Sequence, residues 1–179
     1  RNMVISLERR QSVLRSNLLI IYLLIVNSYK VTKRIKMSNL SEDDLKEFTQ
    51  LISLDLENGD VEKVVSLFQY NKNLYQILGR LLAGGNMFVR LGVNMLLEDL
   101  KELKPDDMKY AFPHLIPLLS NENATIRGDV ADIIGNIGDK SHIELLTPLL
   151  NDEHPQVQEM AEEAIETLEE ENLEDKSSQ

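Results

Sequence analysis

An all-α solenoid of about four antiparallel helix pairs is the fold that this sequence predicts, on two observations. Apolar residues recur at helical spacing from residue 41 onward, and no alternating strand pattern of useful length interrupts them. The second half also repeats itself, because residues 126–137 and 157–168 carry apolar residues at matching positions with an offset of 31, and residues 89–100 form an earlier copy. A helix pair cannot bury its whole apolar stripe alone, so neighbouring pairs are expected to stack and bury it jointly.

The chain has 179 residues, a formal charge of −11 and no cysteine. Its apolar content of 42% suffices for one domain, and the scarcity of glycine, proline and cysteine excludes collagen-like, disulfide-stapled and wholly disordered chains. The charge is unevenly divided, because residues 1–36 carry +7 and residues 37–179 carry −18. Two different segments therefore meet near Met37.

Residues 1–36 form a basic leader with an apolar centre. Its residues 18–26 are consecutive nonpolar or aromatic residues, fewer than the roughly 18 to 20 that cross a bilayer. Three interpretations stay open: a secretory signal without a small-residue cleavage site, a membrane-surface anchor held by the flanking cations, and a segment that is not part of the mature protein. We favour the third, with Met37 as the start, because a helix-start signal follows directly.

Residues 37–171 are expected to form the helical repeat domain. Ser41 stands before three carboxylates, which is typical of a helix N-terminus, and residues 58–60 end this first helix. Its apolar stripe is expected at Leu45, Phe48, Leu51, Ile52 and Leu56. Apolar stripes at helical spacing follow over residues 61–68 and 74–82, before the clearer repeats begin.

The later repeats pair each long helix with a short one. The short helices at 115–119 and 146–150 both end in Pro-Leu-Leu before a polar turn. The last helix carries apolar residues on one side and glutamates on the other, as expected for the end of a stack. Residues 172–179 are expected to form a disordered acidic and polar tail, because carboxylates accumulate at the negative end of the helix dipole. Close helix packing is the expected role of four glycines within these helices, Gly79, Gly92, Gly128 and Gly135.

The repeats resemble a known family. The run from Ile126-Arg127 to Asp152 is similar to the short HEAT-like repeats that are also found in phycobilisome lyases. The resemblance is clear over residues 86–171, whereas residues 41–85 match only as degenerate helices. It implies a right-handed curved solenoid whose second helices line a concave surface that usually faces the ligand.

Arg90 and Arg127 stand at the same place in successive repeats. They are either anion ligands or structural residues whose guanidinium groups bridge the turns between stacked helices, and we favour the structural interpretation. The third repeat has Gln158 instead, which fits a terminal unit without a neighbour beyond it. Asp139 and Asp152 are assigned to the same set of structural repeat residues.

No catalytic, cofactor-binding or metal-binding residue is predicted. His114, His142 and His154 form neither a His-Glu pair nor a His-x-x-x-His spacing, and a chain without cysteine has no thiol nucleophile. We expect His154 to be a solvated turn residue and His142 to pair with Glu144 at the surface. Nucleic acid is not predicted as a partner, because the strongly acidic segment lacks clustered Lys and Arg.

A partner-binding surface is predicted on the helix that follows Pro105. Tyr110 and His114 lie opposite the buried stripe of this helix, matching of the repeats adds Leu145, and a looser alignment adds Lys63. Aromatic and apolar side chains supply contact energy at modest entropic cost. The alternative, that Tyr110 and Leu145 pack beneath a neighbouring repeat, stays open.

The predicted function is a non-enzymatic scaffold or adaptor in the cytoplasm. It would bind another protein or a peptide through the concave face, and the acidic charge favours partners with basic patches. Two alternatives remain: an accessory or lyase-like subunit of an enzyme, and a membrane-tethered interaction module in which residues 1–36 are retained.

Overall fold

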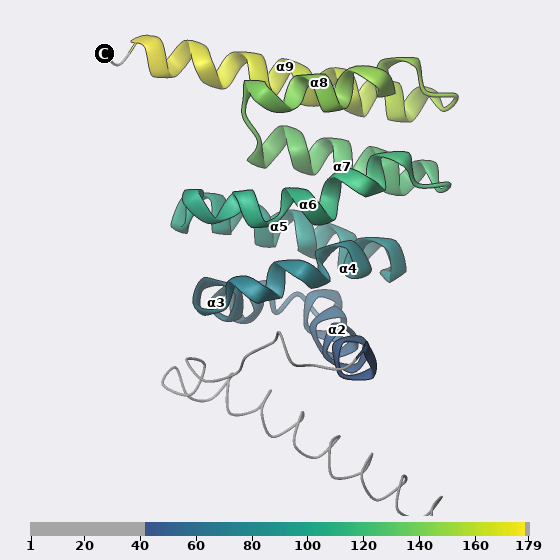
Figure 1. Ribbon diagram of the computed structural model, residues 1–179, viewed down its shortest axis with the longest axis vertical. Helices are drawn as coiled ribbons and strands as arrows, with labels where there is room; N and C mark the ends of the chain where they lie inside the picture. Colours follow the sequence, from purple (N-terminus) through teal and green to yellow (C-terminus); the bar gives the residue numbers. More distant parts are fainter. Residues whose placement is uncertain (1–41, 178–179) are drawn as a thin grey trace, which may run out of the picture.

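The computed structural model describes residues 42–177, in which every regular element is helical (Figure 1). The leader predicted at residues 1–36 lies outside these described residues. Within them, no helix combines the length and the apolar character that a membrane span requires. The long helices are α2 (Glu42–Glu57), α3 (Val61–Tyr70), α5 (Met87–Leu103), α7 (Ala124–Ile137) and α9 (Pro155–Ser177).

Shorter first helices, built from α-helical and 3-10 turns, precede α5, α7 and α9. Pro105, Pro117 and Pro148 stand at the first positions of three 3-10 segments, where proline lacks the N–H that a continuous α-helix would need. The segments are η3 (Lys72–Ile77) and α4 (Leu78–Gly84), then η4 (Pro105–Tyr110), α6 (Phe112–Leu115) and η5 (Ile116–Ser120), then η6 (Lys140–His142), α8 (Ile143–Leu146) and η7 (Thr147–Asn151).

Successive helix pairs are stacked along the long axis of the molecule, with α2 near one end and α9 at the other (Figure 1). Helix α5 contacts α7, and α7 contacts α9, so the second helices form one layer with the first helices packed beside them. Helices α2 and α3 both contact α5 and close the N-terminal end of the stack. The fold is therefore an all-α solenoid, as the repeats predicted.

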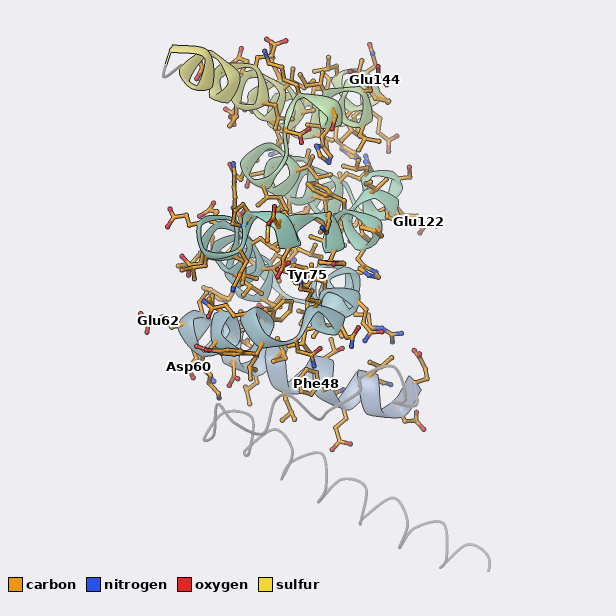
Figure 2. All side chains as sticks on the ribbon, turned by 60° about the vertical axis from the view of Figure 1, so that its left-hand side comes forward. Phe48, Asp60, Glu62, Tyr75, Glu122 and Glu144 are labelled. Carbon is orange, nitrogen blue, oxygen red and sulfur yellow. The ribbon has the colours of Figure 1, made fainter. Side chains whose placement is uncertain are left out.

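The core lies between these layers. The stripe predicted in the first helix is buried at Phe48, Ile52 and Leu56, and the same holds for the apolar faces of the later helices. Figure 2 shows side chains filling the space between stacked helices, whereas Glu62 and Glu144 point outward. Burial of such side chains against a neighbouring repeat is the main term that stabilises a repeat stack.

Helices α7 and α9 approach each other closely at a glycine. A Cβ atom at Gly135 would lie 2.7 Å from the Cα atom of Ala164, so this pair needs a glycine on one side. Gly128 differs from the expectation of close packing, because a Cβ atom there would meet only Met160 Cγ at 3.5 Å, an ordinary van der Waals distance.

Helix α9 ends the stack with a polar outer side. Val157, Ala161 and Leu168 face the core, while the glutamates between them are exposed. The helix continues through residues 172–177, where a disordered tail was predicted. These residues extend a helix that is already formed and need no new nucleus, which opposes the unfavourable dipole on which the prediction was based.

Candidate functional site

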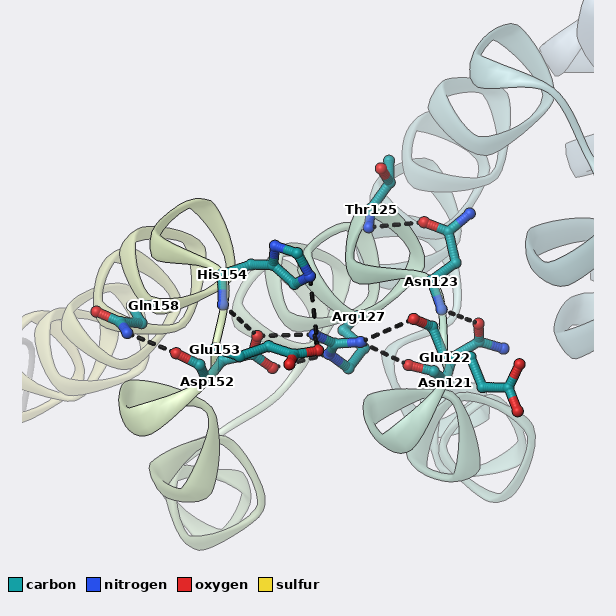
Figure 3. Close-up of polar contacts among 9 residues, drawn as sticks. All are labelled: Asn121, Glu122, Asn123, Thr125, Arg127, Asp152, Glu153, His154 and Gln158. Atoms are coloured by element: carbon teal, nitrogen blue, oxygen red, sulfur yellow. Dashed lines mark hydrogen bonds and ion pairs between the residues drawn. The ribbon is translucent and has the colours of Figure 1, made fainter.

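Arg127 joins the turns of the last two repeats (Figure 3). Its Nε and Nη2 atoms each donate a hydrogen bond of 2.7 Å to Asp152, one to each carboxylate oxygen. Its Nη1 atom donates to the carbonyl oxygens of Asn121 and Glu122 at 2.8 and 3.2 Å. The Arg127 and Asp152 side chains are only 9% and 8% exposed, and the hydrogen bonds from the guanidinium lower the pKa of the Asp152 carboxyl.

Asp152 is itself part of the next turn. Its carboxylate accepts a hydrogen bond of 2.9 Å from the His154 N–H, and its carbonyl oxygen accepts one of 2.6 Å from the Gln158 amide. Gln158, which replaces the arginine in the last repeat, thus contacts only the turn that precedes its own helix. The guanidinium of Arg127 is surrounded by groups of its own chain. A residue that bridges the turns between stacked helices would have such surroundings.

Arg90 has an equivalent position with a different partner. Its Nη1 atom donates to the Gly85 carbonyl at 3.0 Å in the preceding turn, and its Nε atom donates to the carboxylate of Asp129 on α7. The repeat offset places Asn121 where Asp152 stands in the next turn, so the carboxylate equivalent to that of Asp152 is missing for Arg90. Arg90 therefore ties α5 to the side of α7.

Asp139 caps a 3-10 segment and does not contact either arginine. It accepts a hydrogen bond of 2.8 Å from the Ser141 N–H, and the Ser141 hydroxyl lowers the pKa of its carboxyl. The expected surface pair of His142 with Glu144 is not what the structure shows. The His142 ring stacks on Phe112 with 3.9 Å between ring centroids, and its Nδ1 atom lies 3.0 Å from Asp139. His142 thus links two repeats.

Two of the four residues predicted for partner binding lie together. Tyr110 and His114 line an open groove of about 240 Å³ in the layer of first helices. The Lys72 ammonium lies 5.0 Å from the centroid of the Tyr110 ring and also forms an ion pair of 2.6 Å with Asp107. Burial lowers the pKa of His114, so the groove holds a neutral imidazole at pH 7.

The other two predicted residues lie elsewhere. Lys63 forms an ion pair of 2.7 Å with Asp55 and joins α3 to α2. Leu145 lies in α8, in the first helix of the final pair, and is half-buried against the core. The structure therefore does not bring Lys63 and Leu145 to the groove of Tyr110 and His114.

Among the residues that the structure describes, several exposed apolar side chains gather on α5. Met87, Phe88, Leu91 and Met95 are 64%, 58%, 56% and 47% exposed, and they follow one side of the helix at spacings near four residues. From its sequence, this region was expected only to form an apolar repeat unit. The sequence contained a signal for exposed apolar side chains here. The first turns of α5 are apolar around most of their circumference, which is more than one buried face requires.

Half-buried polar groups of α7 lie next to this apolar side of α5. Asp132 accepts a hydrogen bond of 3.0 Å from the Asn94 amide. Burial raises the pKa of the Asp132 carboxyl, and the charges of Glu98, Asp129 and Glu163 raise it further. The Asp132 carboxylate therefore lies in an environment that disfavours its negative charge.

Together these groups form the α5–α7 groove, an open groove of about 280 Å³. Its apolar wall is made by Met87, Phe88, Leu91 and Ile133, and its polar wall includes Asn94 and Asp132. Such a groove can bury apolar side chains of a ligand and place a cation beside a carboxylate. Within the described residues, no three His, Asp or Glu side chains are arranged to hold a metal ion.

The comparison with protein-family models agrees with this architecture. Residues 98–176 match the family model for HEAT repeats. A crystal structure of an engineered protein is similar over 78% of this chain and 62% of that one, with 18% identity and a TM-score of 0.46, so this chain spans less than two thirds of that protein. No curated protein sequence matches the chain. The chain therefore contains HEAT-like repeats over residues 98–176, built as stacked helix pairs.

Proposed function

We propose that this chain is a non-enzymatic protein-interaction scaffold that binds its partner on the surface of the second helices, at the α5–α7 groove. HEAT repeats are commonly protein-interaction scaffolds. The observation that supports this groove is the exposure of Met87, Phe88, Leu91 and Met95 on one side of α5. Contiguous exposed apolar side chains beside polar groups are typical of protein interfaces.

The non-enzymatic part of the proposal is supported by the roles that the histidines have in the fold. HEAT repeats are typically non-catalytic. His142 is occupied in a ring stack and a helix cap, and His114 is held neutral by burial. We place the protein in the cytoplasm, a reducing compartment that a chain without cysteine permits.

The groove of Tyr110 and His114 is a second candidate surface and stays a prediction. Tyr110 is 37% exposed, less than the apolar residues on α5, and the Lys72 and Lys109 ammonium groups lie close to its ring. The two grooves belong to different helix layers, so one experiment can distinguish them.

Photo-crosslinking in the natural cells tests which surface is used. A benzoylphenylalanine placed at Leu91 reports on the α5–α7 groove, one at Tyr110 reports on the first-helix groove, and one at Leu103 is the control on the same helix as Leu91. We expect a discrete crosslinked protein from position 91 and none from 103. Crosslinks from Tyr110 alone would move the interface to the first helices, and no crosslink from any position would contradict the scaffold proposal.

A further inference from the structure

The exposed side of α5 offers anchoring sites at a regular distance. Met87, Leu91 and Met95 are four residues apart, so they follow one another at about 6 Å along the helix axis. Phe88 widens this apolar surface, and the buried Ile133 of α7 lines the same groove. The sites suit large apolar side chains presented at a similar spacing by another rod-like element.

The charges beside the apolar sites are mostly negative. Arg90 is already bound to Asp129 and to a carbonyl oxygen, and Lys101 donates a hydrogen bond of 2.8 Å to the Asn136 carbonyl oxygen. Asp132 accepts its hydrogen bond from the neutral amide of Asn94. A ligand that brings a cation to Asp132 would therefore relieve a charge that the groove itself disfavours.

Two other kinds of occupant fit less well. A second copy of this chain would bring another strongly acidic surface, because residues 37–179 carry −18. An extended peptide that adds to a sheet needs an unpaired strand edge, and residues 42–177 contain no strand. A helix needs no backbone partner and can pack its side chains between those of α5 and α7.

We propose that the α5–α7 groove binds a basic amphipathic helix of a partner protein. The helix places large apolar side chains over Met87, Leu91 and Met95, and Lys or Arg side chains beside Asp132 and Glu98. This inference rests on the proposed function, because it states the chemistry of the partner at the same groove. Its net attraction depends on charge, so binding weakens as salt rises.

A synthetic peptide tests the chemistry with the full chain. The probe is a labelled peptide of about 18 residues, roughly five helical turns, with Leu on one face and Lys and Arg on the flanks. A scrambled peptide of the same composition controls for charge, and a peptide with Glu in place of every Lys and Arg controls for apolar contact. Fluorescence anisotropy measures the affinity of each.

Variants of the groove have matched controls elsewhere on the surface. We expect the double variant Leu91→Ser with Met95→Ser to weaken binding of the amphipathic peptide about tenfold or more, because it removes two anchors. Asp132→Asn keeps the shape and removes the charge, and we expect a loss of about threefold that disappears at about 0.5 M salt. Leu103→Ser and Glu122→Gln alter similarly exposed residues away from the groove and are expected to leave the affinity unchanged.

Several outcomes would overturn the inference. Equal binding of the scrambled peptide would show mere charge attraction, and equal loss in Leu103→Ser would show that the groove is not the site. A concentration-dependent dimer of the wild type that the double variant abolishes would assign the groove to a second copy. If no peptide binds although position 91 crosslinks a cellular protein, the basic-helix inference is wrong and the proposed function stands. If no peptide binds and position 91 gives no crosslink, the inference and the proposed function at this groove are both contradicted.

Discussion

At the scale of single residues, the geometry of the guanidinium explains why one repeat position carries arginine. Arg127 uses three of its nitrogen atoms for Asp152 and for two carbonyl oxygens of a different turn. An ammonium group is a point charge and cannot reproduce this planar fork. The contact therefore aligns two turns as well as compensating a charge.

Replacing this arginine by lysine tests the role of the fork. We expect Arg127→Lys to lower the midpoint of urea unfolding more than Arg90→Lys, because the Arg127 pair is the less exposed and bidentate. Denaturation followed by circular dichroism measures both variants. Equal midpoints for the two variants would mean that the geometry of the fork contributes nothing to stability.

His114 predicts a pH dependence of stability. Burial lowers its pKa in the folded protein, so the unfolded chain binds the proton more readily between the folded pKa and the ordinary value near 6.5. The contribution of the neutral His114 to the free energy of unfolding is complete above the ordinary pKa near 6.5, and it is lost as the pH falls through the pKa of the folded protein. We expect His114→Gln to show a flatter fall of the urea midpoint between about pH 6.5 and pH 5 than the wild type. Identical slopes would contradict the assignment, since His142 and His154 are present in both proteins.

At the scale of elements, the contact of α7 with α9 depends on where each glycine lies. Gly128 and Gly135 lie in the same helix, two turns apart. Only Gly135 has the backbone of α9 within reach of an added methyl group. The two positions therefore separate the cost of a clash from the conformational benefit of alanine.

Alanine is expected to act in opposite directions at these two sites. Gly135→Ala forces α7 and α9 apart and should destabilise the fold by about 2 kcal/mol. Gly128→Ala meets only the flexible Met160 side chain and should stabilise it by about 0.5 kcal/mol, because alanine loses less conformational freedom in a helix. Urea titrations measure the free energy of unfolding of both variants. If this free energy changes in the same direction in both, the packing argument is refuted.

At the scale of the whole molecule, the stack transmits stability only from neighbour to neighbour. Helix α9 contacts α7 and its own first helix, whereas α2, α3 and α4 contact α5. In such an arrangement the stability is close to a sum over units and the interfaces between neighbouring units. A defect at one end should therefore be felt locally.

Hydrogen exchange tests this independence. Leu168 in α9 and Leu78 in α4 are both fully buried, and truncation of either to alanine should cost about 3 kcal/mol. We expect Leu168→Ala to speed amide exchange in α8, α9 and α7 and to leave α2–α4 unchanged, with the reverse pattern for Leu78→Ala. Uniform acceleration along the chain would show a single cooperative unit instead.

The sequence by itself determined the all-helical repeat architecture, because helical spacing and the recurrence of one apolar pattern at offsets of 31 and 37 residues are both readable from the chain. The stripe of Phe48, Ile52 and Leu56 is buried as its spacing predicted. The repeated arginine position likewise indicated contacts between turns, since a guanidinium within a repeat needs carboxylate or carbonyl partners. The breaks at proline could be located too, although their 3-10 geometry could not.

Only the tertiary structure decided which apolar residues remain on the surface. Leu91 and Leu96 belong to the same helix, yet Leu91 is 56% exposed and Leu96 is fully buried. Their difference depends on where α7 and α2 lie around α5, and the spacing of residues in α5 does not contain that information. The same holds for Asp132 beside Asn94 and for His142 on Phe112, because both contacts join residues of different repeats. Periodicity identifies the faces of one helix, whereas the positions of neighbouring helices determine which face is left for a partner.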